Sequence, residues 1–128
     1  MMQIGEFLRK TDLTIDTLRY YEEVGLLRPT RTAGNRRQYC PADIDWVNFL
    51  KRLKQTGMSI QNMQRYATLR YVGDQTIPER LDLLQDQEAR LNTILAETQA
   101  NLDFLHHKMA IYREMQVKST FTPDPPKN

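Results

Sequence analysis

An arginine and two tyrosines, Arg19–Tyr21, stand side by side in a short stretch that ends at Gly25. An arginine guanidinium can bind a phosphate or the major-groove edge of guanine, and a tyrosine hydroxyl can contact a phosphate from a rigid ring. The sequence shows no clustered carboxylates, no His and Cys pair and no phosphate-cradling glycine loop of the kind that active sites use. These residues favour a surface that contacts double-stranded DNA, and a protein that is not an enzyme and uses no cofactor.

Charge divides the 128-residue chain into a basic half and an acidic half. Residues 1–71 hold 12 Lys and Arg against 7 Asp and Glu, a formal charge of +5, whereas residues 72–128 hold 6 against 9, a charge of −3. We therefore expect only the first half to meet a polyanion.

The sequence also indicates the compartment. A single cysteine, Cys40, cannot form an internal disulfide, and residues 1–10 do not resemble a secretory signal segment. No uncharged apolar run approaches the roughly 20 residues that cross a bilayer. We expect a soluble protein in the reducing cytoplasm, without a membrane partner.

Two short helices joined by a tight turn are predicted near the N-terminus. Apolar residues spaced along one helical face predict the first over about residues 3–9, and residues 10–13 form the turn. Thr14 is a good N-cap for the second helix, which should run to about Val24, and Gly25 suits the position just past its end. The arginine and the first tyrosine of the opening stretch should lie on its outer face. This is a helix-turn-helix, whose second helix enters the major groove of DNA.

The segment after the second helix, residues 26–39, is rich in turn-forming and basic residues. Its Pro, Gly and Asn favour a small hairpin over a helix, and Arg31, Arg36 and Arg37 would make the tip cationic. Such a wing would lie beside the DNA phosphates. The alternative is a solvated loop, because runs of charge are usually surface.

Two further helices are predicted next. Pro41 suits the first turn of a helix that runs to about Thr56, and Ser59 can cap the following one, whose free N–H groups could also bind a phosphate. Trp46 and Phe49 widen the apolar stripe of the first of these helices. They are therefore predicted to belong to the core rather than to a ligand site.

A break at residues 72–76 precedes a long helix that starts near Pro78. Along this helix, mostly apolar residues recur in alternating steps of four and three, the heptad period that requires a partner helix. The helix is too long for the preceding domain to cover, so the simplest partner is a second copy of the chain, in a C2 homodimer. The seam positions are Ile77, Leu81, Leu84, Glu88, Leu91, Leu95, Thr98, Leu102, Leu105, Met109 and Tyr112.

Polar residues interrupt the seam at Glu88 and Thr98, where they either set the register or lie at its edge. Beyond Met115 the pattern fails, and three prolines among the last six residues predict a disordered tail. The predicted organisation is a DNA-binding domain over residues 1–71, a linker over 72–76, a dimerisation helix over 77–115 and a tail over 116–128.

Short motifs in order along the chain resemble those of the MerR family of transcription regulators, over about residues 3–115. The resemblance implies a mainly α fold, with a winged helix-turn-helix DNA-binding domain followed by an antiparallel coiled coil of two long helices. One departure is Asp12, where the family often has glycine, but aspartate tolerates a left-handed backbone. The motifs are Ile4-Gly5-Glu6, Thr17-Leu18-Arg19-Tyr20-Tyr21-Glu22, Gly25-Leu26-Leu27, Gly34-Asn35-Arg36-Arg37-Gln38-Tyr39 and Gly57-Met58-Ser59-Ile60.

Regulators of this kind bind a near-palindrome between the two polymerase-contact elements of a promoter whose spacer is too long. When activated, they bend and untwist the spacer so that RNA polymerase, an indirect partner, meets both elements in alignment. Such distortion needs two DNA-binding heads at a fixed separation, which the coiled coil would supply. The alternatives are a winged-helix repressor or architectural protein without activation, and a coiled-coil module whose basic half binds RNA or an acidic protein.

The resemblance also implies roles for single residues. Thr17, Arg19 and Tyr20 would face the major groove, and Lys54 and Ser59 would anchor phosphates. With the cap and wing residues, the candidate DNA-binding set is Thr14, Thr17, Arg19, Tyr20, Arg31, Arg36, Arg37, Tyr39, Lys54 and Ser59. The candidate dimerisation set is Leu81, Leu84, Leu91, Leu95, Leu102, Leu105, Met109 and Tyr112.

The third helix looks most like the branch of the family that responds to aldehyde and thiol stress, which carries a cysteine there. Arg52 occupies the corresponding place, so that chemistry does not carry over. Cys40 is the remaining candidate sensor of an electrophile or oxidant, because a helix N-terminus and nearby cations activate a thiol; the alternative is a half-buried structural residue. Metal sensing is not expected, because residues 72–128 hold no cysteine and the adjacent His106 and His107 cannot chelate as an i, i+4 pair could.

Overall fold

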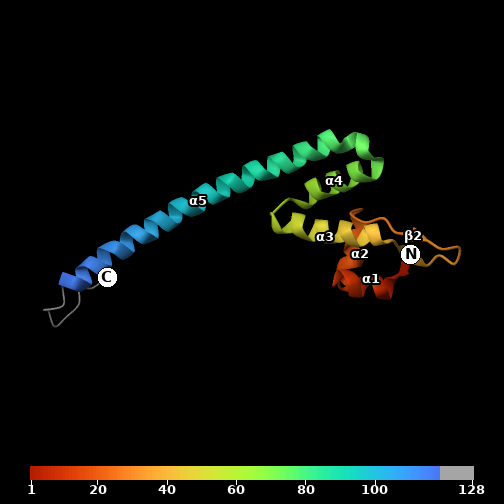
Figure 1. Cartoon of the computed structure of the whole chain (residues 1–128), viewed down its shortest axis with the longest axis horizontal. Helices are drawn as coiled ribbons and strands as arrows, with labels where there is room; N and C mark the ends of the chain where they lie inside the picture. Colours follow the sequence, from red (N-terminus) through yellow and green to blue (C-terminus); the bar gives the residue numbers. More distant parts are fainter. Residues whose placement is uncertain (119–128) are drawn as a thin grey trace. The chain divides into compact units, whose positions relative to one another are not determined.

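The computed structural model describes residues 1–118, which form two compact units. The first unit comprises Met1–Gln87, and the described part of the second comprises residues 88–118. The elements follow in the order β1 (Met2–Gln3), α1 (Ile4–Thr11), α2 (Ile15–Glu23), β2 (Thr30–Arg31), β3 (Arg37–Tyr39), α3 (Pro41–Gln55), α4 (Ile60–Val72), the 3-10 turn η1 (Asp74–Thr76) and α5 (Ile77–Lys118) (Figure 1).

The first two helices form the predicted helix-turn-helix. Thr14 caps α2 by accepting a hydrogen bond from a backbone amide of the first turn at 3.1 Å, and Gly25 follows the helix with a φ of 81°. In the turn, Asp12 has a φ of 56°, the left-handed conformation that aspartate tolerates. α1 continues past its predicted end at residue 9, because Thr11 is buried and donates its hydroxyl to the carbonyl of Phe7.

The predicted hairpin is present, and a strand that the sequence did not reveal completes a small sheet. The strand order is β1-β3-β2, all antiparallel, with Met2 opposite Tyr39 and Arg31 opposite Arg37. The tip of the hairpin turns at Asn35, whose φ of 60° is left-handed and suits asparagine. β1 has only two residues, too few for an alternating pattern to be recognised.

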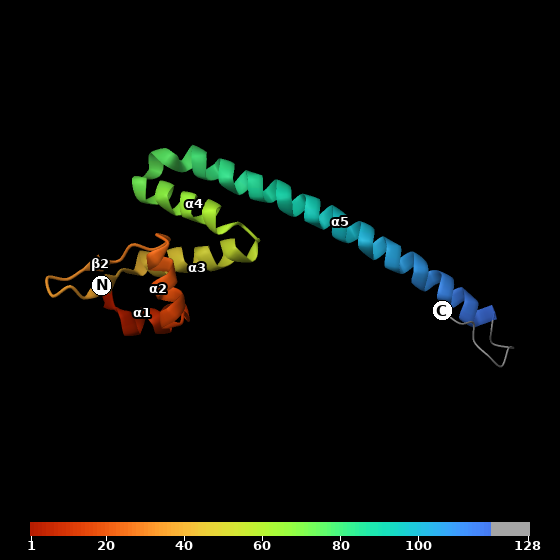
Figure 2. The ribbon, with the colours of Figure 1, turned by 180° about the vertical axis from the view of Figure 1, so that it is seen from behind.

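One core holds the first unit together. α3 lies next to α4 on one side and to α1 and α2 on the other, in both views (Figure 1, Figure 2). The ring of Phe7 stacks on that of Tyr39 with centroids 4.0 Å apart, and the rings of Trp46 and Tyr66 lie 6.0 Å apart. Trp46 is 5% exposed, so it belongs to the core as predicted, and Phe49 packs against that core, partly buried.

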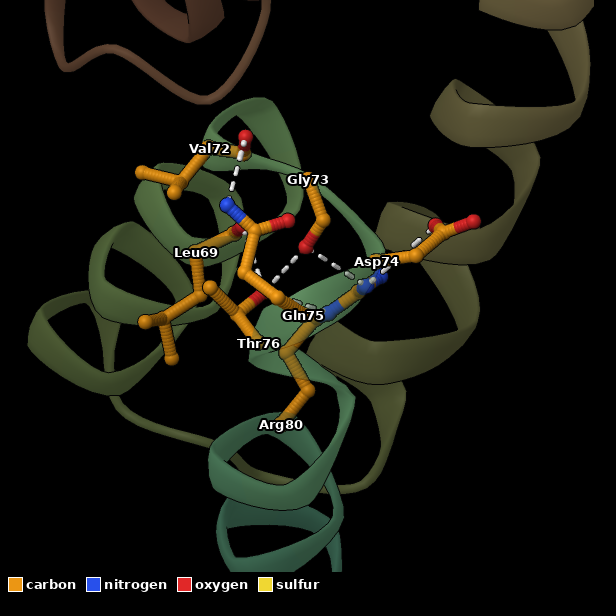
Figure 3. A network of polar contacts seen from close by, with 7 residues as sticks. All are labelled: Leu69, Val72, Gly73, Asp74, Gln75, Thr76 and Arg80. Carbon is orange, nitrogen blue, oxygen red and sulfur yellow. Dashed lines mark hydrogen bonds and ion pairs between the residues drawn. The ribbon is translucent and has the colours of Figure 1, made fainter.

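The predicted break between α4 and α5 is an ordered turn. The hydroxyl of Thr76 lies 2.6 Å from the carbonyl of Leu69 and 2.7 Å from that of Gly73, and donates to them. Arg80, from the first turn of α5, donates to the Thr76 hydroxyl at 3.1 Å and to the Gly73 carbonyl at 3.3 Å (Figure 3). The turn is therefore tied to both helices by side chains.

The first compact unit extends beyond the predicted boundary at residue 71. Leu83 and Gln87 of α5 are buried, and Gln87 Nε2 donates to the carbonyl of Thr56, after the end of α3, at 2.7 Å. The first turns of α5 thus belong to the same unit as the winged domain. The sequence pattern did not predict this longer unit, because residues 72–76 look like a domain boundary. The contact between Gln87 and Thr56 joins residues 31 positions apart.

α5 is a single helix of 42 residues, about 63 Å long at 1.5 Å per residue. It passes the predicted end at Met115 by three residues, to Lys118. The rest of the predicted tail, residues 119–128, lies outside the described residues. Within residues 1–118, no helix is both long and apolar enough to cross a membrane.

Candidate DNA-binding interface

α2 turns an apolar face to the core and a polar face to solvent. Leu18 and Tyr21 are buried, and burial raises the pKa of Tyr21. Arg19 and Tyr20 are exposed, as predicted, and neither side chain forms a hydrogen bond or an ion pair within residues 1–118. The guanidinium of Arg19 is therefore free to bind a phosphate or a base edge.

Two threonines shape the N-terminal end of α2. Besides capping the helix, the hydroxyl of Thr14 donates to the hydroxyl of Thr17 at 2.9 Å. Because Thr17 is the acceptor in that pair, its own proton stays available to a phosphate or base. The first turn of α2 thus offers a hydroxyl donor beside backbone N–H groups.

Side chains from α3 and α4 hold the segment between α2 and the wing by its backbone. Trp46 Nε1 donates to the carbonyl of Leu26 at 2.7 Å, and Gln64 Nε2 donates to the carbonyl of Val24 at 3.0 Å. The hydroxyl of Tyr71 accepts from the backbone amide of Arg28, in the same segment, at 3.0 Å. These bonds give the wing a defined starting point relative to α2.

Glu22 ties α2 to the wing. Its Oε1 accepts a hydrogen bond from the hydroxyl of Tyr39 at 2.6 Å, and its Oε2 lies 2.9 Å from Arg37 Nε, as an ion pair. Both partners belong to β3, whereas Glu22 belongs to α2. One carboxylate therefore sets the position of the helix against the hairpin.

Tyr39 is not placed where a DNA backbone could reach it. Its side chain is fully buried against Phe7. Burial, followed by the hydrogen bond and the charge of Glu22, raises the pKa of Tyr39. Successive strand residues point to opposite faces, and the motif alone did not show which face of β3 is covered. We therefore leave Tyr39 out of the interface.

Tyr39→Phe is expected to lower the free energy of unfolding by about 1–3 kcal/mol near pH 7, because the partly buried Glu22 loses a donor. The raised pKa means that the folded state favours neutral Tyr39. The corresponding stability is present below about pH 10 and is lost as the pH rises towards the folded-state value. Urea unfolding, followed by circular dichroism near pH 7 and above pH 10, measures the free energy of unfolding. Between these two pH values it should fall less in Tyr39→Phe than in the wild type.

Tyr20→Phe is the matched control, because Tyr20 is exposed and forms no hydrogen bond through its side chain within residues 1–118. It should leave both unfolding curves unchanged. Equal alkaline losses in the wild type and in Tyr39→Phe would contradict the link between Tyr39 and Glu22.

A cationic groove lies between the wing and the start of α1, lined by Arg31, Arg36 and Arg37 with Gln3 and Ile4. Arg37 is paired with a carboxylate, and Arg31 donates only to a backbone carbonyl at the wing tip, at 3.2 Å. The first turn of α1 adds the positive end of a helix dipole. The groove has the chemistry of a phosphate site. Sequence reasoning missed its α1 side, because pairing of β1 with β3 brings these segments together.

The remaining two phosphate candidates lie at the other end of α3. Ser59 caps α4, as predicted, by accepting from the amide of Asn62 at 3.1 Å, and Lys54 is exposed in the last turn of α3. The 15 residues of α3 span about 20 Å, and its first residue follows closely after the wing. Lys54 and Ser59 would therefore serve a different phosphate from the one in the groove.

Cys40 is the N-cap of α3, where the sequence placed it. Its backbone N–H donates to Asp43 Oδ2 at 2.9 Å, and its thiol donates to the same oxygen at 3.4 Å. The side chain is half-buried. The contacts of Cys40 are those of a capping residue.

Comparison with known proteins identifies the family. Residues 2–69, more than half of the chain, match the MerR HTH family regulatory protein family. The chain belongs to the MerR family of transcriptional regulators. An uncharacterised HTH-type transcriptional regulator of Haemophilus influenzae is 36% identical to it over 106 residues, which cover 82% of this chain and 78% of that protein. The HTH-type transcriptional regulator AdhR of Bacillus subtilis is 40% identical over 91 residues, 70% of this chain and 65% of AdhR.

The fold agrees with this membership. The structure of HiNmlR, a MerR family regulator lacking the sensor domain and bound to promoter DNA, superposes with a TM-score of 0.69 and 33% identity. The similarity covers 90% of this chain and 92% of that one. The predicted mainly α MerR fold, a winged helix-turn-helix followed by a long helix, is thereby confirmed, and the chain is a transcription regulator.

Proposed function

We propose that this MerR-family regulator binds a palindromic promoter as a homodimer, with α2 of each protomer in the major groove and the wing on the adjacent backbone. One observation carries the proposal: Arg19 and Tyr20 are exposed together on α2. Glu22 ties this helix to the cationic wing. α2 would read base edges, while the groove beside α1 and the distant anchors at Lys54 and Ser59 hold phosphates. HiNmlR, similar in fold, is bound to promoter DNA in its structure.

Dimerisation through α5 would cover a seam that is exposed in the single chain. Leu95 is 67% exposed and Leu105 is 52% exposed. Full burial of such a side chain is worth about 1.5–3 kcal/mol. In the first unit, Leu83 and Gln87 of α5 are buried, and Leu84, a predicted dimerisation residue, packs against the same core. Leu81 is half exposed, so within the first unit it is the dimerisation residue open to a partner. We propose an antiparallel coiled coil of two α5 helices, continuing through the described part of the second unit.

The two heads of such a dimer would bend and untwist the promoter spacer until RNA polymerase meets both of its contact elements. Smooth bending of a DNA site of about 20–30 base pairs costs on the order of 1–6 kcal/mol. The phosphate contacts of the two DNA-binding domains can offset this cost. We propose that a small stress signal triggers this change, and that the protein acts in the cytoplasm, where promoter DNA is found.

In vitro transcription tests activation directly. Selection from a random duplex library would first identify the palindrome. The palindrome would then be placed in a long-spacer promoter and in a promoter of ordinary spacer length. We expect the regulator to raise transcription from the long-spacer promoter alone. Reduced transcription from both promoters would contradict activation by distortion and indicate a repressor.

Arg31→Gln and Arg36→Gln are each expected to weaken DNA binding by a similar factor for different DNA sequences. Each should also make the plot of the logarithm of the DNA-binding constant against the logarithm of salt concentration less steep, by about 1 in slope. The reason is that both residues line the groove and would release counterions on contact with phosphate. Gel-shift titrations at several salt concentrations measure the slope. Arg65→Gln, an exposed arginine on α4 outside the groove, is the control. An unchanged slope in the groove variants would remove the groove from the interface.

If Cys40 is a sensor of electrophiles or oxidants, Cys40→Ser should abolish the response to the inducer without weakening DNA binding, because serine is the better N-cap. The capping contacts with Asp43 are the reason to expect an intact fold. Promoter output with aldehydes and thiol oxidants measures the response. A normal response in Cys40→Ser would assign the cysteine to capping alone.

A further inference from the structure

A cleft in the first unit, lined by residues of α3, α4 and the first turn of α5, contains three aromatic rings. Trp46 and Phe49 stack with ring centroids 5.6 Å apart, and Phe49 and Tyr66 lie 5.3 Å apart. The indole N–H of Trp46 is already bonded to a backbone carbonyl, but the hydroxyl of Tyr66 has no hydrogen-bond partner within residues 1–118. Trp46 and Tyr66 are 5% and 9% exposed and Phe49 is partly buried, so the cleft offers a small apolar surface, chiefly from Phe49, beside one free hydroxyl.

Two arginines line the same cleft. The guanidinium of Arg70 lies 4.3 Å from the ring centroid of Trp46 and makes no hydrogen bond or ion pair with the described part of the chain. Arg80, largely buried, uses Nε and Nη2 on the turn before α5. One carboxylate, Asp45, also lines the cleft, which leaves a net positive charge. An unpaired guanidinium held over an aromatic ring can bind a carboxylate in a fork.

We propose that this cleft binds a small planar organic anion, such as an aromatic carboxylate. The anion's ring would pack on Phe49 and Tyr66, and its carboxylate would accept hydrogen bonds from Arg70 and Arg80. A planar ring gains both apolar burial and aromatic stacking there. A neutral ring would leave the charge of Arg70 unpaired, and a small aliphatic acid would leave the aromatic surface uncovered.

Occupancy of the cleft acts on the turn that starts α5, because Arg80 belongs to both. Arg80 bonds the Thr76 hydroxyl and the Gly73 carbonyl, and also lies 3.8 Å from Asp74 (Figure 3). An anion that draws the guanidinium towards the cleft weakens these contacts. Since α5 is the proposed dimer helix, the anion would thereby be a signal to the regulator, and this regulatory step rests on the proposed function above.

The binding step is tested with benzoate on the whole chain without DNA, so that it does not depend on the proposed function. Trp46 is the sole tryptophan and lines the cleft, so its fluorescence reports occupancy. We expect benzoate to change the fluorescence saturably, with a calorimetric titration giving the same dissociation constant. Benzamide and acetate should not saturate. Equal responses to all three compounds would overturn the site.

Three variants of α4 locate the binding. Arg70→Gln should weaken benzoate binding about fivefold or more, because it removes the unpaired guanidinium. Arg70→Lys should restore part of the affinity as a point charge. Arg65→Gln, exposed on the same helix and outside the cleft, should bind as the wild type does. Circular dichroism checks that each variant folds. Unchanged binding in a folded Arg70→Gln would contradict the proposal.

Native-state hydrogen exchange tests the effect on the turn. The amide of Thr76 is bonded to the carbonyl of Gly73 at 3.0 Å, and the amide of Gly73 to that of Leu69 at 3.2 Å. Saturating benzoate should speed exchange of these two amides and leave those in the middle of α3 unchanged. If benzoate binds but exchange at the turn does not change, the cleft is a binding site without the regulatory step.

Discussion

Leu95→Glu combined with Leu102→Glu is expected to prevent the proposed dimerisation and to weaken binding of the proposed promoter palindrome by about a hundredfold or more. Both leucines lie on the predicted seam and are exposed in the single chain, at 67% and 42%. Carboxylates at facing seam positions would be desolvated next to each other, which costs more than the lost apolar burial alone. A monomer also binds only one half-site. It therefore loses the gain in affinity from linking two DNA-binding domains, which is typically a factor of about 10²–10⁴.

Sedimentation velocity measures the oligomeric state, and gel-shift titration measures the affinity. Ala100→Glu is the matched control, because Ala100 is exposed and lies on the opposite side of α5 from the seam, five residues after Leu95. It should remain a dimer and bind as the wild type does. A stable dimer of the Leu95→Glu and Leu102→Glu double variant would show that the partner covers another face of α5.

Arg19→Ala is expected to weaken binding of the palindrome about tenfold or more at fixed salt, since a good charged contact to a base or phosphate is worth about 1–3 kcal/mol. Arg19 forms no ion pair or hydrogen bond through its side chain within residues 1–118, so its removal should leave the melting temperature unchanged. A loss of affinity can then be assigned to the DNA contact. Gel-shift titration with the palindrome and with a scrambled duplex provides the measurement.

The control for Arg19 is Arg90→Ala, an exposed arginine of α5 in the acidic half of the chain. It carries the same change of charge and should bind both duplexes as the wild type does. A comparable weakening in the two variants would indicate a general effect of net charge. Wild-type affinity in Arg19→Ala would place the recognition surface elsewhere on the domain.

The recognition helix could be predicted from sequence because its signals are local. The cap at Thr14, the glycine after α2 and the aspartate in the turn act on neighbouring backbone, and each has the conformation that its residue type indicates. The long helix was predictable for a related reason, since a heptad pattern repeats many times and each repeat adds evidence. Its start at Ile77 was placed correctly, but its C-terminal end and its boundary with the first unit were not.

The wing shows where local reasoning stops. A hairpin within residues 26–39 was expected, but its side chains belong to different environments: Tyr39 is buried, Arg37 is paired with Glu22, and Arg36 is exposed. The partner residue is 15 positions away from Arg37 and 17 from Tyr39. No pattern within the hairpin carries that information, because burial depends on what packs against each face.

The sequence by itself determined the family, the helix-turn-helix with its caps and the long helix, because each depends on residues that are near in the chain or repeated along it. The tertiary structure decided which candidates face solvent. It buried Tyr39 under α1, opened a cationic groove by pairing β1 with β3, and gathered Trp46, Arg70 and Arg80 around one cleft. These outcomes depend on contacts between distant residues, which are set when all the elements share one core.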